Sequence, residues 1–248
     1  MLTLDVFLAL APDQPSDAFD GPLRQEAERI AARMPEGTTM RVVHNLRHHR
    51  DDALAAGSSL ERFDDLVKTG LVPNATRVPI TSFDAALEVS VPDGTDPDVV
   101  LEAIEGLAER LAIVDPARSA AVLGSDYPIM DGDGALQIFV CLRRVSPASH
   151  EQFCDYWLND LVKHTTKTPG KTAYRQLHAD PPLTVRAAKA AGVEIDDVDG
   201  VALEFYPAVE GLYAATDWAS QPNSAMIQSE AQMIDFGRGA IVGYVPRT

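Results

Sequence analysis

The alternation of hydrophobic and polar positions predicts a chain of short strands and amphipathic helices. In the first half, apolar residues alternate or run together over four segments that we interpret as strands, at residues 2–10, 38–46, 83–91 and 118–123. Apolar residues spaced three or four apart predict helices between them, at 22–34, 60–67 and 97–113. A loop containing prolines is expected at 72–79. This order is typical of a ferredoxin-like unit, an antiparallel sheet with helices on one face.

The second half repeats this plan. Strands are predicted at 135–143, 171–179, 200–208 and 239–246, with helices near 149–164, 183–191 and 220–233. Three short motifs also recur in the same order: Arg41 to His44 as Arg175 to His178, Ala86-Leu87-Glu88 as Ala202-Leu203-Glu204, and Asp115 to Val122 as Asp235 to Val242. We therefore predict a tandem duplication.

The duplication defines the expected domain organisation. The turn-rich stretch 131–134 would join half one, residues 1–130, to half two, residues 131–248. Each sheet would leave one apolar face uncovered, and stacking the two sheets covers both. The fold class predicted is thus α+β, with two ferredoxin-like units packed as an intramolecular α+β barrel.

Residues 153–178 form the most informative stretch. Ser149 and Gln152 have the spacing of a capping box, which predicts that a helix starts there. Helical spacing then places four side chains on one face: Phe153, Trp157, Leu161 and His164. A Thr-Pro-Gly stop follows, and in the next strand alternation puts Thr172, Tyr174, Gln176 and His178 on one face. Arg175 falls on the opposite face, where we expect it at the interface between sheets.

This helix, turn and strand resembles the EthD family of the dimeric α+β barrel superfamily. The resemblance rests on Phe153, Tyr156, Trp157, Pro169, Gly170, Tyr174 and His178. It implies cyclase, isomerase or decarboxylase chemistry without a cofactor, and a barrel that related proteins build from two subunits. A cofactor-free monooxygenase is also known in this superfamily. The chain departs from the family at Leu161, where a histidine is usual.

Two histidines are the candidates for proton transfer, because imidazole titrates near neutral pH. We assign His178 as the proton-transfer residue and His164 as a second acid/base or a substrate anchor. Each also has a purely structural interpretation. His178 could be a hydrogen-bonded histidine at a strand end, and His164 could stabilise the last turn of its helix.

The aromatic residues gather in half two, which predicts a pocket there and a scaffold role for half one. Half one could still hold a site of its own. A concave, mostly apolar site with few polar groups would suit a small aromatic or polyketide-like substrate. The residues expected to line it are Tyr156, Trp157, Leu161, Tyr174, Tyr206 and Trp218.

Acidic residues inside predicted strands or turns are further candidates for proton transfer or for structural ion pairs. Glu204 interrupts an apolar strand, so it must be paired or protonated, and a raised pKa would make it an acid/base candidate. Its counterpart Glu88 favours a structural pairing common to both halves. Asp115 and Asp235 each precede an arginine by three positions, which suggests local ion pairs or turn caps.

Composition narrows the classes of partner. A net charge of −16 makes nucleic acids and anionic membranes poor partners. The histidines His44, His48 and His49 lack a metal-binding arrangement, and no glycine-rich phosphate loop is present, so no metal, nucleotide or flavin is expected.

The first residues lack the features of a signal peptide, and we expect a cytoplasmic protein. Two cysteines, Cys141 and Cys154, exclude a disulfide framework and are expected in the core. The expected partner is a small-molecule substrate, and the pseudo-dimer could pair further as a homodimer. A non-catalytic ligand-binding protein is the third possibility beside the two enzymatic ones.

Overall fold

The computed structural model describes residues 1–46, 83–221, 224–235, 238 and 240–246. The predicted helix at 60–67, the loop at 72–79, and His48 and His49 lie outside the described residues. In the described part of the chain the strands are β1 Leu2–Leu8, β2 Thr39–Asn45, β3 Ala85–Val91, β4 Ala120–Met130, β5 Leu136–Leu142, β6 Ala173–Ala179, β7 Gly200–Tyr206 and β8 Ala240–Pro246.

All strand pairs are antiparallel, and the strands close into a barrel in the order β1-β3-β2-β8-β5-β7-β6-β4. Within β1 to β4 the order is β4-β1-β3-β2, and within β5 to β8 it is β8-β5-β7-β6, so both halves use the same arrangement. The ring closes where β2 pairs with β8 and β4 pairs with β6. The predicted α+β class with an antiparallel sheet is therefore confirmed.

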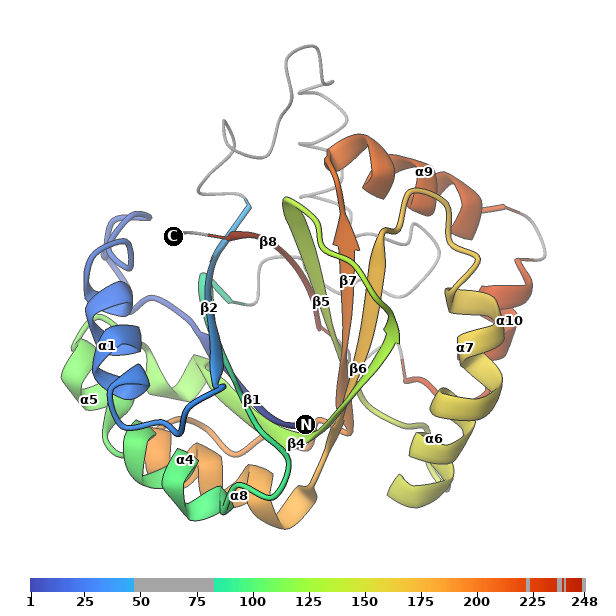
Figure 1. Cartoon of the computed structure of the whole chain (residues 1–248). Coiled ribbons are helices and arrows are strands. Elements are labelled where there is room, and N and C mark those ends of the chain that lie inside the picture. The colour runs from blue at the N-terminus through green and yellow to red at the C-terminus, as the bar shows by residue number, and fades with distance from the viewer. Residues whose placement is uncertain (47–82, 222–223, 236–237, 239, 247–248) are drawn as a thin grey trace.

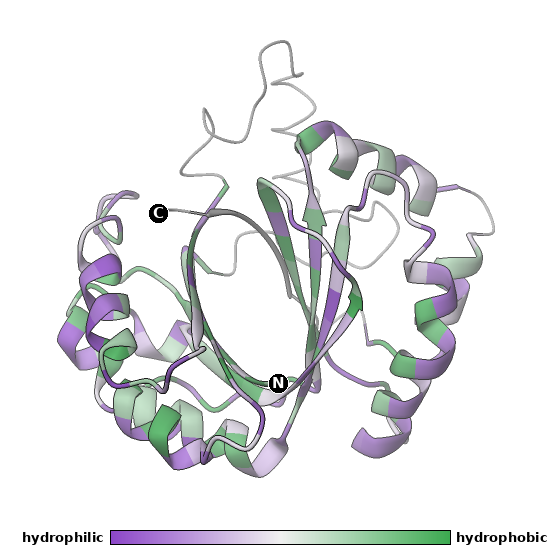
Figure 2. Cartoon of the chain, viewed as in Figure 1, coloured by the Kyte–Doolittle hydropathy of each residue, from purple (hydrophilic) through white to green (hydrophobic). Residues whose placement is uncertain are grey.

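Two groups of helices cover the outside of the barrel (Figure 1). One group lies against β1 to β4 and consists of α1 Pro22–Ala31, α4 Pro97–Ile104, α5 Leu107–Leu111 and α8 Pro181–Ala191. The other lies against β6 and β7 and consists of α6 His150–Tyr156, the π-helix η2 Trp157–Leu161, α7 Val162–Thr165 and α10 Ala225–Glu230, with α9 Val209–Ala219 at one end. Figure 2 shows green apolar residues along both the strands and the helices that face them.

Helix α8 crosses between the halves. It follows β6 in the chain, yet it packs on β4 and beside α4. Ala187, Ala188 and Ala191 join the apolar layer of half one, and the Thr184 hydroxyl donates to the Leu123 carbonyl at 3.0 Å. Small alanine side chains let the helix approach the sheet closely.

The barrel interior is polar around one arginine. Arg175 on β6 donates to Glu88 on β3 at 3.0 Å and to Asp126 on β4 at 2.7 Å, so it joins the two halves as the alternation predicted. Asp5 lies beside them, fully buried, and neither of its carboxylate oxygens has a hydrogen-bond partner among the described residues. Burial, and then the negative charge of Glu88, raises the pKa of Asp5 well above its ordinary value, which favours the neutral acid there.

Several predicted boundaries were wrong. The helix expected at 97–113 is two helices, because Gly106 adopts a left-handed conformation (φ +68°) and its N–H donates to Ala190 of α8. The helix expected at 220–233 is replaced by α9, which the sequence analysis missed, and by the shorter α10. The strand expected at 118–123 extends to Met130 because its second part pairs with β6.

The repeat of Ala-Leu-Glu was also misinterpreted. Glu88 points into the barrel and pairs with Arg175, whereas Glu204 lies on the outer face and pairs with Lys171. The motif is thus out of phase by one residue between β3 and β7, and a shift of one residue reverses the face of every side chain. The two glutamates have no common structural role.

The other two repeats fit the structure better. Arg41 on β2 and Arg175 on β6 both point inward to Glu88, and His44 and His178 follow on the outer face. Asp115 caps a turn by accepting from the Ala117 N–H at 3.1 Å, which is one of the roles expected for it.

Candidate functional site

The outer face of β6 carries a chain of hydrogen bonds beneath the helix that starts at His150. The capping box of Ser149 and Gln152 forms as predicted and fixes the start of α6. The Trp157 indole N–H donates to the Tyr174 hydroxyl at 2.9 Å. The Gln176 amide nitrogen donates to that hydroxyl and to the Trp157 carbonyl, both at 3.2 Å. All of these groups are buried, so each hydrogen bond removes a desolvation cost.

His178 ends this chain. Its Nε2 lies 3.0 Å from Oε1 of Gln176, and the Gln176 nitrogen is already used as a donor. The histidine nitrogen must therefore carry the hydrogen of that bond, which leaves Nδ1 as the basic nitrogen. Gln176 thus fixes the tautomer of His178 and the plane of its ring.

Two aromatic rings enclose the His178 imidazole. The Trp157 ring stacks on it with centroids 4.7 Å apart and an interplanar angle of 10°, and the Tyr127 ring lies 4.7 Å away on the other strand, β4. His178 is only 8% exposed, whereas Tyr127 is 37% exposed and separates the imidazole from solvent. Burial, and then the positive charge of His150, lowers the pKa of His178 to about 4. His178 is consequently a neutral, oriented imidazole at physiological pH.

A surface pocket of about 310 Å³ shares Tyr127 with this site, although His178 itself does not line the pocket. Ser125, which pairs directly with His178 across the two strands, and Tyr127 form its wall. The remaining lining comes from Asp126, Met1, Leu2, Asp93 and Gly94. Sequence reasoning missed Tyr127, since nothing in its strand indicates that it would pack on a residue of the other half.

The predicted apolar pocket around the aromatics is filled by the side chains themselves. Trp157, Leu161, Tyr174 and Tyr206 are all buried, and the Tyr206 hydroxyl donates to Glu204 at 2.8 Å. Trp218 lies half-buried on α9, separate from the stack of Trp157 on His178. The structure therefore brings Trp157, Tyr174 and His178 together and does not open a cavity between them.

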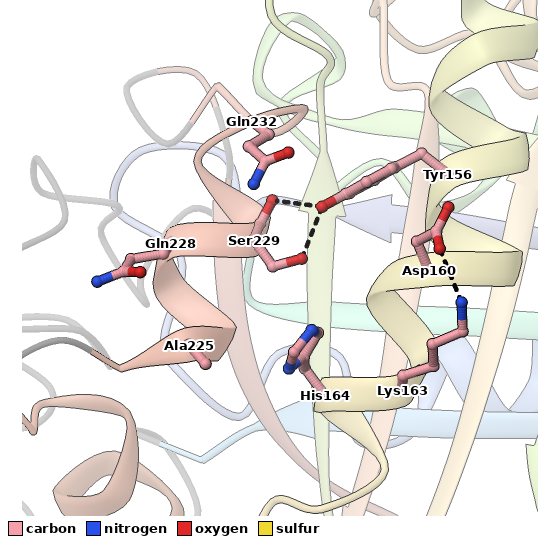
Figure 3. A pocket seen from close by; sticks show the side chains of 8 residues that line it. All are labelled: Tyr156, Asp160, Lys163, His164, Ala225, Gln228, Ser229 and Gln232. Atoms are coloured by element: carbon pink, nitrogen blue, oxygen red, sulfur yellow. Dashed lines mark hydrogen bonds and ion pairs between the residues drawn. The ribbon is translucent and has the colours of Figure 1, made fainter.

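His164 lies elsewhere. The π-helical turn at Trp157–Leu161 widens the helix, so buried residues recur every four positions, at Phe153, Trp157, Leu161 and Thr165. His164 is rotated away from that face, contrary to the prediction. It lines a second pocket of about 320 Å³ with Tyr156, Asp160, Lys163, Ala225, Gln228, Ser229 and Gln232 (Figure 3).

The second pocket is mostly polar. Tyr156 closes one side, because its hydroxyl hydrogen-bonds the Ser229 hydroxyl at 2.6 Å and ties the helix to α10. Lys163 and Asp160 form an ion pair at its rim, with both side chains more than half exposed. Such a lining does not match the apolar site that the sequence predicted.

A largely buried ion pair between Lys171 and Glu204 lies beside Tyr174. Lys171 Nζ is 2.6 Å from the Glu204 carboxylate and 4.6 Å from the centre of the Tyr174 ring. The Lys171 side chain is fully buried, and a buried ammonium group requires a negatively charged partner. Glu204 supplies that partner, so its place in the strand has a structural explanation. Glu230 on α10 faces the same pair, and burial, followed by the charge of Glu204, raises its pKa to about 8.

Within the described residues, no group of three or more His, Cys, Asp or Glu side chains has a geometry that could hold a metal ion. None of the helices described is long and apolar enough to cross a membrane.

Comparison with known proteins identifies the fold. The sequence matches no protein-family model and no curated protein. An anthrone oxidase-like protein of known structure superposes with a TM-score of 0.58 and 12% identity, over 100% of this chain and 91% of the other. A proposed monooxygenase from Fusobacterium nucleatum gives a TM-score of 0.51 and 10% identity, over 100% and 93% of the two chains.

A dye-decolorizing peroxidase from Bacteroides thetaiotaomicron gives a TM-score of 0.51 at 10% identity, over 99% of this chain and 92% of the other. Likeness at such low identity shows the architecture alone. These proteins therefore share the fold of this chain.

Proposed function

We propose that this protein is a cofactor-independent enzyme that uses His178 for general acid/base catalysis on a small enolisable carbonyl or aromatic compound. The observation that carries the proposal is the His178 imidazole, which is neutral, fixed in one tautomer by Gln176, and stacked on Trp157. A base with one oriented, unprotonated nitrogen beside a pocket is the arrangement that proton abstraction requires. Isomerase and aldol-type cyclase reactions begin with such a step, whereas a decarboxylase would use the same histidine to protonate the carbanion that remains after CO₂ leaves.

The proposed substrate approaches from the pocket beside Ser125 and Tyr127. Tyr127 covers the imidazole, so rotation of its side chain would bring a bound compound to Nδ1. Trp157 and Tyr174 hold the ring from behind and are positioning residues. His164 opens into a different pocket and has no place in this step.

A cofactor-free oxidase or monooxygenase is the second candidate. It is favoured by the structures of the same fold that are described as anthrone oxidase-like and as a proposed monooxygenase. The same proton abstraction would give a carbanion that reacts with molecular oxygen. A non-catalytic ligand-binding role is the third candidate, and the close packing of the aromatics supports it.

We also propose that the barrel arose by tandem duplication of an EthD-like unit, with residues 1–130 as scaffold and residues 131–248 carrying the site. The shared strand order and the matching positions of His44 and His178 support this proposal. The single chain would then correspond to the two subunits of a dimeric protein of the same fold.

Deuterium exchange tests the proposed reaction without knowledge of the product. The protein is incubated in D₂O with a panel of aromatic ketones, 1,3-diketones and anthrone, and NMR follows loss of the acidic C–H. We expect His178→Gln to slow exchange by at least about a hundredfold, as for loss of a general base. His44→Gln, at the same strand position in half one, should have no effect.

Oxygen uptake in the same samples separates the two enzymatic candidates. Exchange with oxygen consumption supports the oxidase, and exchange without it supports the isomerase type. If His178→Gln exchanges deuterium as fast as the wild type while remaining folded, the proposed function is wrong.

A further inference from the structure

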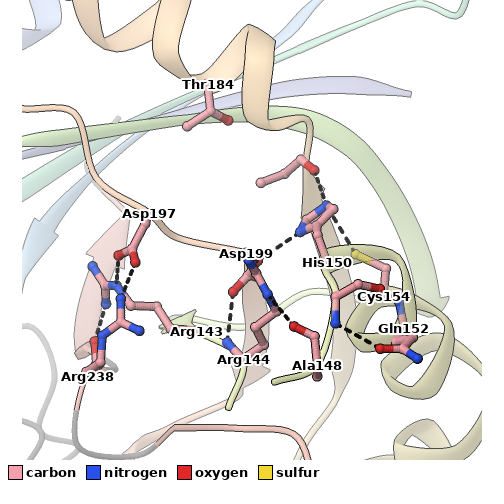
Figure 4. A network of polar contacts seen from close by, with 12 residues as sticks. Arg143, Arg144, Ala148, His150, Gln152, Cys154, Thr184, Asp197, Asp199 and Arg238 are labelled. Atoms are coloured by element: carbon pink, nitrogen blue, oxygen red, sulfur yellow. Dashed lines mark hydrogen bonds and ion pairs between the residues drawn. The ribbon is translucent and has the colours of Figure 1, made fainter. Parts of the chain in front are cut away.

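A second cluster of reactive groups lies at the start of α6 (Figure 4). His150 Nδ1 is 2.8 Å from Oδ1 of Asp199, and its Nε2 is 2.9 Å from the Ala179 carbonyl and 3.5 Å from Sγ of Cys154. These residues come from α6, from the end of β6 and from the residue before β7. Neither His150 nor its relation to Cys154 was predicted from the sequence.

Asp199 holds the histidine in place. It is 4% exposed, and it accepts from the Arg144 N–H at 2.8 Å and pairs with the Arg144 guanidinium. Arg144 in turn donates to the Ala148 carbonyl at 2.9 Å. A carboxylate fixed by this many donors remains ionised, and these contacts lower its pKa.

The contacts of His150 favour its charged form. Both ring nitrogens face acceptors, a carboxylate on one side and a carbonyl with a thiol on the other. Donating to both sides requires a hydrogen on each nitrogen, and only the imidazolium form has both hydrogens. The hydrogen bond to Asp199, followed by that to Cys154, raises the pKa of His150 to about 10. A fixed positive charge therefore lies within 3.5 Å of the Cys154 sulfur.

We propose that Cys154 is a reactive thiol, activated by the His150 imidazolium beside its sulfur, and that it forms mixed disulfides with low-molecular-weight disulfides. A neighbouring cation stabilises the thiolate, which is the nucleophilic form. Cys154 and His150 are both partly exposed, so a small disulfide can reach the sulfur. Cys154 also packs against the apolar layer under α6, as the sequence predicted, and the proposal adds a chemical role to that packing.

The reaction is ordinary thiol–disulfide exchange. The Cys154 thiolate attacks one sulfur of the disulfide, a new S–S bond forms, and the original S–S bond breaks. The departing thiolate takes the electron pair of that bond and a proton from water. Cys141 cannot resolve the product because it is buried in the barrel wall, where burial raises the pKa of its thiol. The mixed disulfide would persist until an external thiol reduces it.

Alkylation kinetics test the proposal in the whole chain. The probe is iodoacetamide, and mass spectrometry measures labelling of Cys154 at pH 6 to 8, with unreactive Cys141 as an internal control. An ordinary thiol with a pKa of about 8.5 reacts roughly tenfold more slowly for each unit below that value. We expect the Cys154 rate to be nearly flat over this range instead. Oxidised glutathione should then add one glutathione at Cys154 alone.

Two variants locate the cause. His150→Gln should slow alkylation at pH 6 by at least about tenfold and restore an ordinary profile, and Asp199→Asn should fall between it and the wild type. The other charged groups near this cluster are Arg144, and Glu151 and Asp155 on α6 itself, and the neutral imidazole of His178 is the other titratable group. His44→Gln is the matched control and should change nothing.

Ultraviolet absorbance of the thiolate provides a second measurement on the unmodified protein if a variant does not fold. A wild-type rate that rises about tenfold per pH unit between pH 6 and 8, or a folded His150→Gln protein with the wild-type profile, would overturn the proposal.

Discussion

His44 and His178 occupy matching positions on β2 and β6, three residues after an inward-facing arginine, yet their surroundings differ. His44 Nδ1 lies 3.2 Å from a carboxylate oxygen of Asp20. His178 instead contacts a glutamine amide and two aromatic rings. The same strand order therefore supports an acid-paired histidine in one half and a neutral, oriented one in the other.

The layers of side chains between the strands and the helices that cover them also differ between the two halves. Beneath the helices of half one, Leu, Val, Ile and Ala side chains form a continuous apolar core. Beneath α6, η2 and α7, large aromatic rings alternate with amide, ammonium and carboxylate groups. Apolar packing dominates the first layer, whereas the second also depends on a network of hydrogen bonds that orients His178.

Removing the Trp157 ring should have the largest effect. Trp157→Ala deletes a buried ring and leaves the Tyr174 hydroxyl and His178 without support, so we expect a loss of about 3–5 kcal/mol in the free energy of unfolding. Ile30→Val, in the layer of half one, should cost only about 0.5–1.5 kcal/mol. Urea unfolding of both variants measures this. Equal, small losses would show that Trp157 is not central to its layer.

A methyl group at Gly200 should be the next most disruptive change. A Cβ there would lie 2.5 Å from the Trp157 ring and 2.6 Å from the Leu177 carbonyl. Overpacking of this kind costs about 1–3 kcal/mol, so Gly200→Ala should lower the free energy of unfolding by that amount. Gly21 has φ −89° and open space around its Cβ position, so Gly21→Ala should be neutral or slightly stabilising. Thermal melting compares the two.

The lowered pKa of His178 predicts a pH dependence of stability. The unfolded histidine binds a proton below about pH 6.5, while the folded one stays neutral down to about 4. Between these values the unfolded state binds more protons, so stability falls as the pH falls from 6.5 towards 4, by at most about 1.4 kcal/mol per unit. His178→Gln should remove this contribution and His44→Gln should not. NMR titration of the His178 ring measures its pKa directly, and a value near 6.5 would contradict the expected environment.

Tyr156→Phe should have the smallest effect. It removes the hydrogen bond to Ser229 between the helix and α10 but keeps the ring, so we expect a loss of about 0.5–1.5 kcal/mol. Ser229→Ala should cost a similar amount, and the double variant should cost less than the sum of the two single changes. Additive effects in denaturant unfolding would show that the two groups do not interact.

Much of the fold was predictable because local patterns and the global fold agree. The capping box, the alternation of β6 and the inward position of Arg175 all follow from residue spacing. The sequence did not show how small local irregularities change which side chains share a face. A single π-helical turn rotated His164 off the helix face that carries Trp157, and a phase shift of one residue separated the faces of Glu88 and Glu204.

The candidate site was only partly predictable, because local spacing does not show which distant segments come into contact. His178, Trp157 and Tyr174 were identified from one helix and one strand. Tyr127 and His150 reach the site through pairing of distant strands and loops, which no local spacing encodes. Filling of the expected pocket depends on side-chain volumes, which a pattern of polar and apolar letters does not contain.

The position of α8 has a consequence for fragment complementation. A fragment ending near residue 131 would expose the apolar surface of β4 that Ala187, Ala188 and Ala191 cover in the whole protein. The other fragment would carry α8 with no sheet beneath it. Each piece would thus expose apolar surface that the other covers, so two separately produced fragments should each aggregate, and should recover the native barrel only when refolded together.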